Sequence, residues 1–307
     1  MVQTILGSGG IIGMEASFCL MQYSKTVRQV SRKPKKINDS DQIFPADLII
    51  ESEVSEAVKG SDIVYLTAGL PYNTKTWEKY WPIIMQNTVK ACQKHGCKLV
   101  FFDNVYMYGK VEGWMTEDTP INPCSKKGEI RAKIADYLQA EMKSKNIEAL
   151  IARSADFYGP RATNTYINPM IFDKLKAGKK PQLLISANKK HSYTFTPDAA
   201  RGMVELGNNA EAYGEVWHLP TDSYALTGAE LVRAIAQEFN VSDNYSILNP
   251  FMINIAALLS PIIKETKEML YQFNEDYLFN SSKFDARFFK ATSYLDGIHS
   301  TYQSQYK

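Results

Sequence analysis

The stretch that decides the fold is Val2–Gly13, V-Q-T-I-L-G-S-G-G-I-I-G, in which an apolar pentapeptide runs into a glycine-rich turn. The apolar part, Val2–Leu6, predicts a short buried strand. A helix is predicted after the glycines, because apolar residues recur there with helical spacing, at Ile12, Ala16, Cys19, Leu20 and Tyr23. A strand, a glycine turn and a helix in this order are typical of the first βαβ unit of a dinucleotide-binding fold.

The glycines of this turn stand at positions 7, 10 and 13 and fit the pattern G-x-x-G-x-x-G, whereas Ile12 breaks the alternative G-x-G-x-x-G. Glycine permits a tight turn and a close backbone approach, so that a pyrophosphate can rest on the N-terminus of the helix. The predicted cofactor contacts in the turn are Gly7, Gly9, Gly10, Ile11, Ile12 and Gly13.

The next predicted strand, Val27–Val30, is followed by Ser31 and Arg32. An acidic residue at this place suits the ribose 2′-hydroxyl of NAD(H), while an arginine suits a 2′-phosphate, which a guanidinium binds with paired donors. We therefore predict that Ser31 and Arg32 contact the cofactor and that NADP(H) is preferred over NAD(H). The other interpretation of the basic run 28–36 is an ordinary solvated loop.

Short apolar runs and longer helical patterns alternate through the first half of the chain. Strands are predicted at Asp62–Thr67, Lys98–Phe102 and Ala149–Ala152. One helix between them is marked by Trp77, Trp81, Ile84 and Thr88 and stopped by Gly96, and a second covers Ile130–Met142. This alternation predicts an α/β fold, a Rossmann-type doubly wound parallel sheet, with ligands beyond the carboxyl ends of the strands.

The pattern becomes irregular after Arg153. Glu215–Leu219 indicates a late return to the sheet, and Thr227–Phe239 predicts a helix with Thr227 as its N-cap and Glu230 three residues on. We expect a Rossmann domain made of residues 1–160 plus about 191–222. A smaller α/β substrate-binding domain is expected from about 161–190 and 223–307.

The composition is that of an ordinary globular protein, with 307 residues, 45% hydrophobic and 22% charged. A formal net charge of +2 gives no reason to expect a nucleic-acid partner. The most apolar stretch, Ile253–Ile263, is too short to span a bilayer, so no membrane partner is expected. The cysteines at 19, 92, 97 and 124 match no zinc pattern and predict reduced thiols in a cytoplasmic protein without a metal site.

Taken together, these motifs resemble the extended short-chain dehydrogenases/reductases, the NAD-dependent epimerase/dehydratase family of sugar-nucleotide enzymes. The resemblance includes the glycine turn, the segment Met115–Pro120, Arg153 with Phe157–Arg161, and Tyr193–Ala199. It implies an oxidoreductase or epimerase acting on a hydroxyl or carbonyl of a small polar substrate such as a sugar or nucleotide sugar. A homodimer through two helices of the Rossmann half is implied as well. Further cofactor contacts implied by the family motifs are Asp47, Leu48, Thr67, Ala68, Gly69, Asn87 and Tyr158.

The family's catalytic residues are replaced in this chain. Aligning Pro123–Gly128 on the family's P-x-S-P-Y-G puts Lys127 at the position of the catalytic Tyr and Arg131 at that of the ribose-binding Lys. Asn104 takes the place of the hydroxyl residue at the strand end, and Tyr106 is expected on the same side of that strand.

We expect a non-standard hydride-transfer site from these four residues. Lys127, made neutral by positive neighbours, would be a general base, and Arg131 would hold the nicotinamide ribose and so bind cofactor as well. Asn104 would donate a hydrogen bond to the reacting oxygen, and Tyr106 would be a relocated proton donor.

The alternative interpretation makes Lys127 and Arg131 surface charges and Tyr106 a core aromatic. The chain would then be a catalytically silent NADP(H)-binding sensor or interaction protein. His191 stands where nucleotide-sugar enzymes usually place an Arg, and it is expected to be a pocket-lining or capping residue rather than a metal ligand. His218 is expected to be a strand residue.

Overall fold

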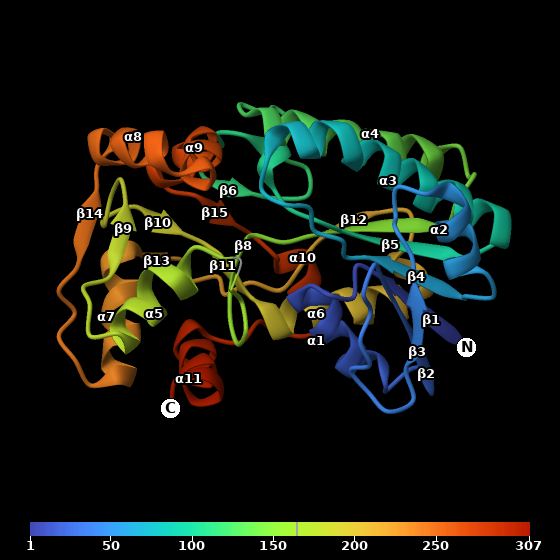
Figure 1. The fold of residues 1–307 in the computed structure, drawn as a ribbon, viewed down its shortest axis with the longest axis horizontal. Helices are drawn as coiled ribbons and strands as arrows, with labels where there is room; N and C mark the ends of the chain where they lie inside the picture. Colours follow the sequence, from blue (N-terminus) through green and yellow to red (C-terminus); the bar gives the residue numbers. More distant parts are fainter. Residues whose placement is uncertain (164) are drawn as a thin grey trace.

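The computed structural model describes residues 1–163 and 165–307. Its centre is a seven-stranded parallel sheet with the strand order β12-β7-β5-β4-β1-β2-β3, which confirms the predicted α/β class (Figure 1). The chain order reverses between β1 and β4, where Leu6 of β1 is paired with Leu66 of β4. The strands are β1 Val2–Leu6, β2 Thr26–Ser31, β3 Gln42–Pro45, β4 Ile63–Leu66, β5 Lys98–Asp103, β7 Ala149–Arg153 and β12 Val216–His218.

Helices cover both faces of this sheet (Figure 1). Ile5 and Tyr65 point into the cluster under α1 and α6, while their neighbours Leu6 and Leu66 point into the cluster under α2, α3 and α4. The alternation follows from the period of two along a strand and leaves both faces apolar. The helices are α1 Ile11–Leu20, α2 Glu51–Val58, α3 Thr74–His95, α4 Lys126–Lys143 and α6 Thr196–Gly207.

Two boundaries differ from the sequence-based expectation in ways that affect the site. The helix α4 begins at Lys126, four residues before the predicted start, because the Ser125 side chain caps it by accepting a hydrogen bond from the Gly128 amide. The expectation that Asn104 and Tyr106 share a strand face is wrong. β5 ends at Asp103, and Oδ1 of Asn104 accepts a hydrogen bond from the Tyr106 amide at 3.1 Å, which turns the chain into the short helix η1, Tyr106–Tyr108.

The second half consists of short strand pairs, one of which includes β6 from the first half, and of helices around its own core. The pairs are β8 Asp156–Tyr158 with β11 Tyr193–Phe195, β9 Gln182–Leu184 with β14 Ser246–Leu248, β10 Lys190–His191 with β13 Leu226–Thr227, and β6 Trp114–Met115 with β15 Leu278–Phe279. The helices are η2 Asn168–Phe172, α5 Asp173–Lys176, η3 Ala210–Ala212, α7 Gly228–Phe239, α8 Pro250–Leu259, α9 Pro261–Thr266, η4 Lys267–Phe273, α10 Ser282–Asp285 and α11 Tyr294–Gln305.

Several local expectations are confirmed. Gly96 ends α3 with φ +67°, and α7 begins with the capping box of Thr227 and Glu230. The return to the sheet appears as β12, with His218 as its last residue. The proposed division into two domains remains a prediction.

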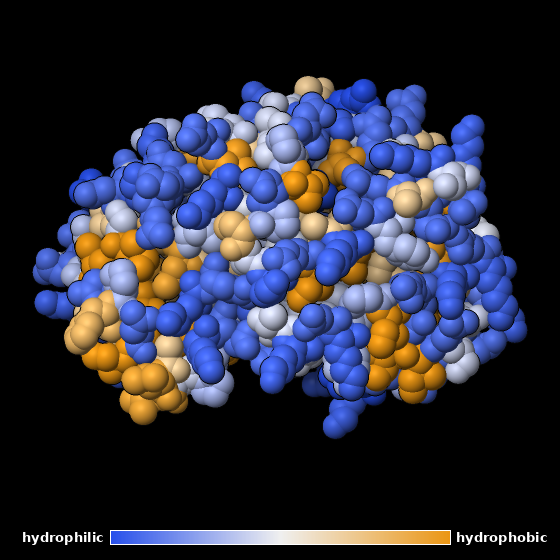
Figure 2. All heavy atoms as spheres, turned by 90° about the horizontal axis from the view of Figure 1, so that it is seen from above, coloured by the Kyte–Doolittle hydropathy of each residue, from blue (hydrophilic) through white to orange (hydrophobic). Residues whose placement is uncertain are grey.

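One part of the surface is unusually apolar. The side chains of Phe251, Leu258 and Leu259 on α8 are 72%, 85% and 86% exposed. Figure 2 shows hydrophobic side chains gathered at the end of the molecule where α8 and α9 lie. Within the described chain, no helix combines the length and the apolar composition that crossing a bilayer requires.

Candidate cofactor and active site

The glycine turn between β1 and α1 is tight for a steric reason. Gly7 has φ +99°, and a Cβ on it would lie 2.4 Å from the Cα of Ala68, which follows β4. A Cβ on Gly13 would lie 3.0 Å from the Gly7 carbonyl oxygen. A Cβ on Gly9, in contrast, would meet nothing within 4 Å among the residues that the structure describes. The outer glycines let the turn pack on the end of β4, and the middle of the turn faces open space.

The amides of this turn are only partly used by the protein. Gly7 and Ser8 donate to the Val30 carbonyl, and Gly10 donates to the Gly7 carbonyl. Gly10 is the N-cap of α1 but has no side chain to cap it. The amides of Ile11 and Ile12 have no acceptor within residues 1–163 and 165–307. Unpaired amides at the positive end of a helix dipole form a binding site for an anion.

Other predicted cofactor residues follow the neighbouring strands at the same edge of the sheet. Thr67 comes after β4 and its hydroxyl donates to the Leu6 carbonyl at 3.3 Å. Asp47 and Leu48 come after β3, and the Asn87 side chain donates to the Leu48 carbonyl at 3.0 Å. Asn87 therefore supports the Asp47–Leu48 loop, while the loop itself borders the edge where a dinucleotide would lie. Gly69 likewise follows β4, and a Cβ there would meet nothing within 4 Å.

Arg32 lies just beyond the last residue of β2, Ser31, whose carbonyl accepts from the Ala46 amide at 3.0 Å. Its side chain is exposed and makes no hydrogen bond or ion pair with the rest of the described chain. A guanidinium in this state can bind a phosphate without first breaking another contact.

Tyr158 is not brought to the turn. Its side chain is 1% exposed and stacks on Tyr294 at 5.6 Å, within the core of the second half. A Cβ on Gly297 would lie 2.2 Å from the Tyr158 hydroxyl oxygen, so the side chain points toward α11. The cofactor contact expected of Tyr158 is therefore not made by its side chain.

Lys127 lies in the first turn of α4 with its side chain completely buried. Its Nζ is 2.8 Å from the Glu265 carboxylate and 2.7 Å from that of Glu268, and it donates to the Thr74 hydroxyl at 2.9 Å. The expectation that its neighbours are positive is wrong, because the groups that contact the amine are carboxylates. Two anions favour the ammonium form, which cannot accept a proton, so the geometry gives no support to a neutral Lys127 base.

The pKa of Glu265 reflects its contacts in this cluster. Its burial raises the pKa, but hydrogen bonds from Lys127 and Thr74 outweigh that effect and lower the pKa of Glu265 to about 2. Glu265 and Glu268 come from α9 and η4, so the cluster ties the segment 261–273 to the start of α4. No local sequence signal points to these partners, because they are 138 and 141 residues away from Lys127.

Arg131 is also buried, at 3% exposure. Its guanidinium pairs with Asp103 at the end of β5 and lies 4.4 Å from the ring centroid of Trp81. Arg153 approaches the same carboxylate at 3.6 Å. The interpretation of Lys127 and Arg131 as surface charges is therefore wrong. The Arg131 guanidinium is paired with Asp103 and is not free at the site. Asp103 was missed as a site residue although it directly follows a predicted strand.

Tyr106 is stacked on Trp77, with ring centroids 6.4 Å apart, and its side chain interacts with that of Tyr72. Burial, and to a smaller extent the nearby Tyr72 and Asp156, raises the pKa of Tyr106 well above its usual value. The phenol therefore remains protonated, as a proton donor must be. Asn104, whose Oδ1 accepts a hydrogen bond from the Tyr106 backbone amide, lies beside it.

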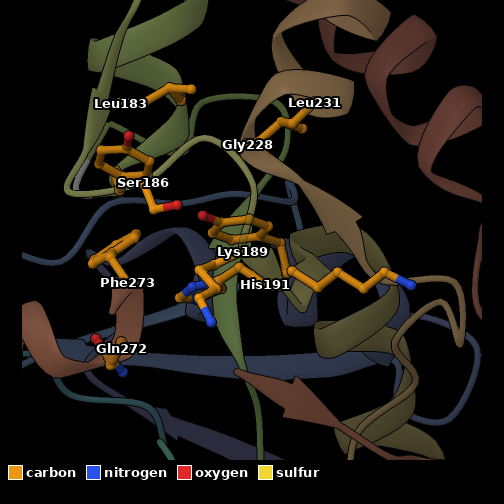
Figure 3. A pocket seen from close by; sticks show the side chains of 11 residues that line it. Leu183, Ser186, Lys189, His191, Gly228, Leu231, Gln272 and Phe273 are labelled. Carbon is orange, nitrogen blue, oxygen red and sulfur yellow. The ribbon is translucent and has the colours of Figure 1, made fainter. Parts of the chain in front are cut away.

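His191 lines a small cavity of about 20 Å³ on the side of the second half, as its expected pocket-lining role predicts. Figure 3 shows it among Ser186, Gln272 and Phe273. The other residues that line the cavity are Tyr166, Leu183, Lys189, Lys190, Tyr193, Gly228 and Leu231.

Known proteins share this fold over its whole length. The structure of UDP-glucuronic acid 4-epimerase from Bacillus cereus in complex with NAD matches with a TM-score of 0.81 at 18% identity, covering 99% of this chain and 98% of that one. UDP-glucose 4-epimerase from Thermus thermophilus, also in complex with NAD, matches with a TM-score of 0.79 at 17% identity, covering 99% and 98%. At such identities the likeness concerns the fold.

Sequence comparison gives a shorter match. A curated relative, the uncharacterised UDP-glucose epimerase YtcB of Bacillus subtilis, is 19% identical over 180 residues, which cover 56% of this chain. The matched part spans 57% of that relative's length. Nothing in these matches favours the alternative of a catalytically silent sensor.

The family model settles the relationship that the glycine turn, the sheet order and the strand-end motifs indicate, since it matches residues 4–219. The chain belongs to the NAD dependent epimerase/dehydratase family.

Proposed function

We propose that this chain binds a nicotinamide dinucleotide across the ends of β1, β2, β3 and β4 and uses it to oxidise or reduce a hydroxyl or carbonyl of a small polar substrate. The observation that carries the proposal is the glycine turn, whose middle is open and whose helix amides at Ile11 and Ile12 have no acceptor in the described chain. When bound, such a cofactor supplies a hydride acceptor or donor at its nicotinamide ring. Family membership and the fold support the proposal.

The substrate class that we propose is a sugar or nucleotide sugar. Solved structures with this fold include a UDP-glucuronic acid 4-epimerase and a dTDP-glucose 4,6-dehydratase. A direct test incubates the protein with NADPH or NADH and a panel of sugar and carbonyl compounds and follows the nicotinamide absorbance. Oxidation of the cofactor with any member supports an enzyme. Tight cofactor binding without oxidation across the whole panel would contradict the oxidoreductase.

Within the site we propose Asn104 as the hydrogen-bond donor to the reacting oxygen and Tyr106 as a proton donor. Lys127 and Arg131 contribute as charged groups held by Glu265, Glu268 and Asp103. Lys127 as an ammonium ion fixes the segment 261–273 against α4, and Arg131 fixes the end of β5 next to Asn104.

We further propose a preference for NADP(H), since Arg32 is exposed and has no competing partner in the described chain. Ligand at about 100 times its dissociation constant stabilises a fold by about 2.7 kcal/mol. NADP(H) should therefore raise the melting temperature more than the same concentration of NAD(H), and Arg32→Asp should reverse that order. Lys35→Asp makes the same charge change in the same run and should leave the order unchanged. Equal shifts for both cofactors before and after Arg32→Asp would refute the role of Arg32.

The cellular setting and assembly are proposals of the same kind. We propose a cytoplasmic location because all four cysteines are free thiols. We also propose a homodimer through α3 and α4, the two long helices on one face of the sheet. Light scattering of the purified protein tests the dimer, and a monomer at micromolar concentration contradicts it.

A further inference from the structure

The helices α8 and α9 carry a group of apolar side chains that point away from the protein. These are Phe251, Ile255, Leu258, Leu259 and Ile262, with exposed fractions between 49% and 86%. We call this group the α8–α9 face. It lies at the end of the molecule where Figure 2 shows hydrophobic side chains gathered. A contiguous apolar patch of this kind marks a surface that binds something.

The α8–α9 face belongs to a stretch of sequence without charge. No Asp, Glu, Lys or Arg occurs from Ser246 to Ile263. A helix with so many apolar residues ordinarily lies inside a core. In the described structure, however, α8 buries only Ile253, and α9 buries no side chain. The surroundings that suit these helices are therefore not supplied by the described chain.

The charges that follow this stretch are sorted by sign. Glu265 and Glu268 turn inward, where both carboxylates bind the buried Lys127 ammonium. Lys264 and Lys267 alternate with them in the sequence, are exposed, and make no ion pair with any residue that the structure describes. Residues three apart share one side of a helix, which explains the separation. The outward side next to the α8–α9 face therefore carries two positive charges that no acid neutralises.

This combination suits a lipid surface more than a protein partner. The core of a protein–protein interface is enriched in Tyr, Trp and Arg and depleted in Lys. The α8–α9 face has instead aliphatic side chains, a single Phe and lysines beside them. At a bilayer surface, apolar side chains enter the boundary of the acyl chains while lysine ammonium groups remain among the headgroups. The sign of the charge matches the phosphates of anionic lipids.

We propose that the α8–α9 face docks on the surface of an anionic lipid bilayer. Phe251, Leu258 and Leu259 enter the boundary between headgroups and acyl chains, and Lys264 and Lys267 contact lipid phosphates. The expectation of no membrane partner rests on the length needed to cross a bilayer, and a helix that lies on the surface needs no such length. None of the residues proposed for cofactor or substrate belongs to this face.

The docking surface is held in place from its inner side. Lys127 at the start of α4 binds the carboxylates of Glu265 and Glu268, which lie between and beside the two outward lysines. The segment 261–273 thus meets the Rossmann half on one side and would meet lipid on the other. A surface that is already ordered loses less conformational entropy when it binds.

The first test measures the binding of the ligand-free protein to vesicles. One set of vesicles is phosphatidylcholine alone, and the other is an equimolar mixture of phosphatidylcholine and phosphatidylglycerol. We expect the wild type to sediment with the mixed vesicles, to bind the neutral ones more weakly, and to be released as the salt concentration rises. Absence of binding to the mixed vesicles at millimolar lipid, or equal binding to both sets, overturns the proposal.

The second test removes the apolar contact. Leu258→Glu with Leu259→Glu should weaken binding to the mixed vesicles at least about 100-fold, because two leucines no longer enter the bilayer. Leu295→Glu is the matched control, since Leu295 is 65% exposed on α11, on the opposite side of the second half from α8 (Figure 1). It should bind as the wild type does. Undiminished binding of the double variant overturns the proposal.

The third test removes the charges. A lysine near an anionic surface contributes about fivefold to binding, so Lys264→Gln with Lys267→Gln should weaken binding to the mixed vesicles about 25-fold. Binding to the neutral vesicles should not change. Lys143→Gln with Lys145→Gln makes the same change at two exposed lysines at the end of α4 and should leave both affinities unchanged. A loss of the same size in both variants would overturn the contact of Lys264 and Lys267 with lipid.

Two measurements guard against misfolded variants and against another occupant. In the wild type, the amides of α8 and α9 should exchange hydrogen more slowly with mixed vesicles than without them, and unchanged exchange overturns the proposal. Light scattering without lipid tests a second copy of the chain on this face. A lower mass for Leu258→Glu with Leu259→Glu than for the wild type would assign the face to that copy and overturn lipid docking. None of these readouts involves a dinucleotide, so their failure leaves the proposed oxidoreductase to its own test.

Discussion

At the scale of single residues, substitutions in the glycine turn should separate effects on folding from effects on cofactor binding. Gly7→Ala would place a Cβ 2.4 Å from the Ala68 backbone at a positive φ, so it should destabilise the fold. Gly9→Val adds a side chain where no atom of the described part of the chain lies within 4 Å of the Cβ position. We expect Gly9→Val to keep the melting temperature of the ligand-free protein and to weaken dinucleotide binding at least about 10-fold, a change of about 1.4 kcal/mol. Calorimetric titration with both cofactors measures this, and unchanged affinity would mean that the open middle of the turn does not face the pyrophosphate.

His218 provides a prediction on pH. Burial lowers its pKa, an effect that the hydrogen bond to the Asn280 carbonyl opposes and the charges of Arg153 and Lys283 reinforce, to about 3. An unfolded chain takes up this proton near pH 6.5, so below that pH the unfolded state binds more protons than the folded one. The free energy of unfolding should therefore fall as the pH drops from about 6.5 toward 3, by up to about 1.4 kcal/mol per pH unit.

The measurement compares urea unfolding near pH 7 with unfolding near pH 5. In His218→Gln the difference between the two pH values should be smaller than in the wild type. The absolute stability near pH 7 should be lower too, because the hydrogen bond to Tyr108 at 2.8 Å is changed. His299→Gln should show the wild-type difference. An identical pH difference in all three proteins contradicts the account.

The same scale shows why some of the site was predictable from the sequence. The turn at 7–13 is encoded locally, since steric limits on neighbouring backbone require glycine there. The state of Lys127 was not predictable, because the carboxylates that hold it come from a distant segment with no characteristic motif. An alignment with the family shows which residue replaces the catalytic one, but not which groups surround that residue in the fold. Those groups decide whether an amine is neutral or charged.

At the scale of elements, the cluster around Lys127 joins α4 to the segment 261–273. Lys127→Met leaves Glu265 and Glu268 without their cation, at 21% and 24% exposure. We expect a loss of about 3 kcal/mol in the free energy of unfolding, the lower end for breaking a buried ion pair, because both carboxylates retain some water. Lys126→Met is the matched control, since its side chain is 71% exposed and its ammonium pairs with the Glu129 carboxylate. It should leave the free energy of unfolding nearly unchanged, because solvent screens an exposed ion pair.

Urea unfolding measures both variants, and hydrogen exchange shows where the loss occurs. In Lys127→Met the amides of 261–273 should exchange faster while those of β1 and β4 stay protected. Because the folded pKa of Glu265 is below its ordinary value, this stabilisation is present above about pH 4.5 and lost as the pH falls toward 2. A similar small effect of both substitutions would show that the cluster does not hold the segment.

Whole elements were easier to predict than their ends. Strands β1, β4, β5 and β7 match their apolar runs because a parallel strand with two covered faces must be apolar throughout. The start of α4 was missed because its first turn is charged, and only the cap at Ser125 marks it. That turn carries Lys127, so the error concerned the site itself.

At the scale of the whole molecule, the alternating sequence pattern predicted the order of strands and helices. It did not predict the contacts between the two halves of the chain. The pair of Asp156 and His191 joins β8 to β10, and the cluster at Lys127 joins α4 to α9 and η4. The cluster at Lys127 crosses the boundary between the regular and the irregular parts of the chain, whereas Asp156 and His191 both lie after Arg153. Such contacts depend on how the second half folds over the sheet, which no local period encodes.

The outer surface of α8 leads to the last prediction, because it tests whether those helices lie on the molecule as described. Leu258 and Leu259 are 85% and 86% exposed, while Ile253 on the same helix is 5% exposed. The double change Leu258→Glu with Leu259→Glu should leave the melting temperature within about 2 °C and reduce the binding of a hydrophobic dye, because it removes apolar surface that contacts only water. Ile253→Ala should instead cost about 2–5 kcal/mol, since it opens a cavity under α8. If the double change destabilised the protein as much as Ile253→Ala does, the two leucines would have to be buried, and α8 would pack with the opposite face inward.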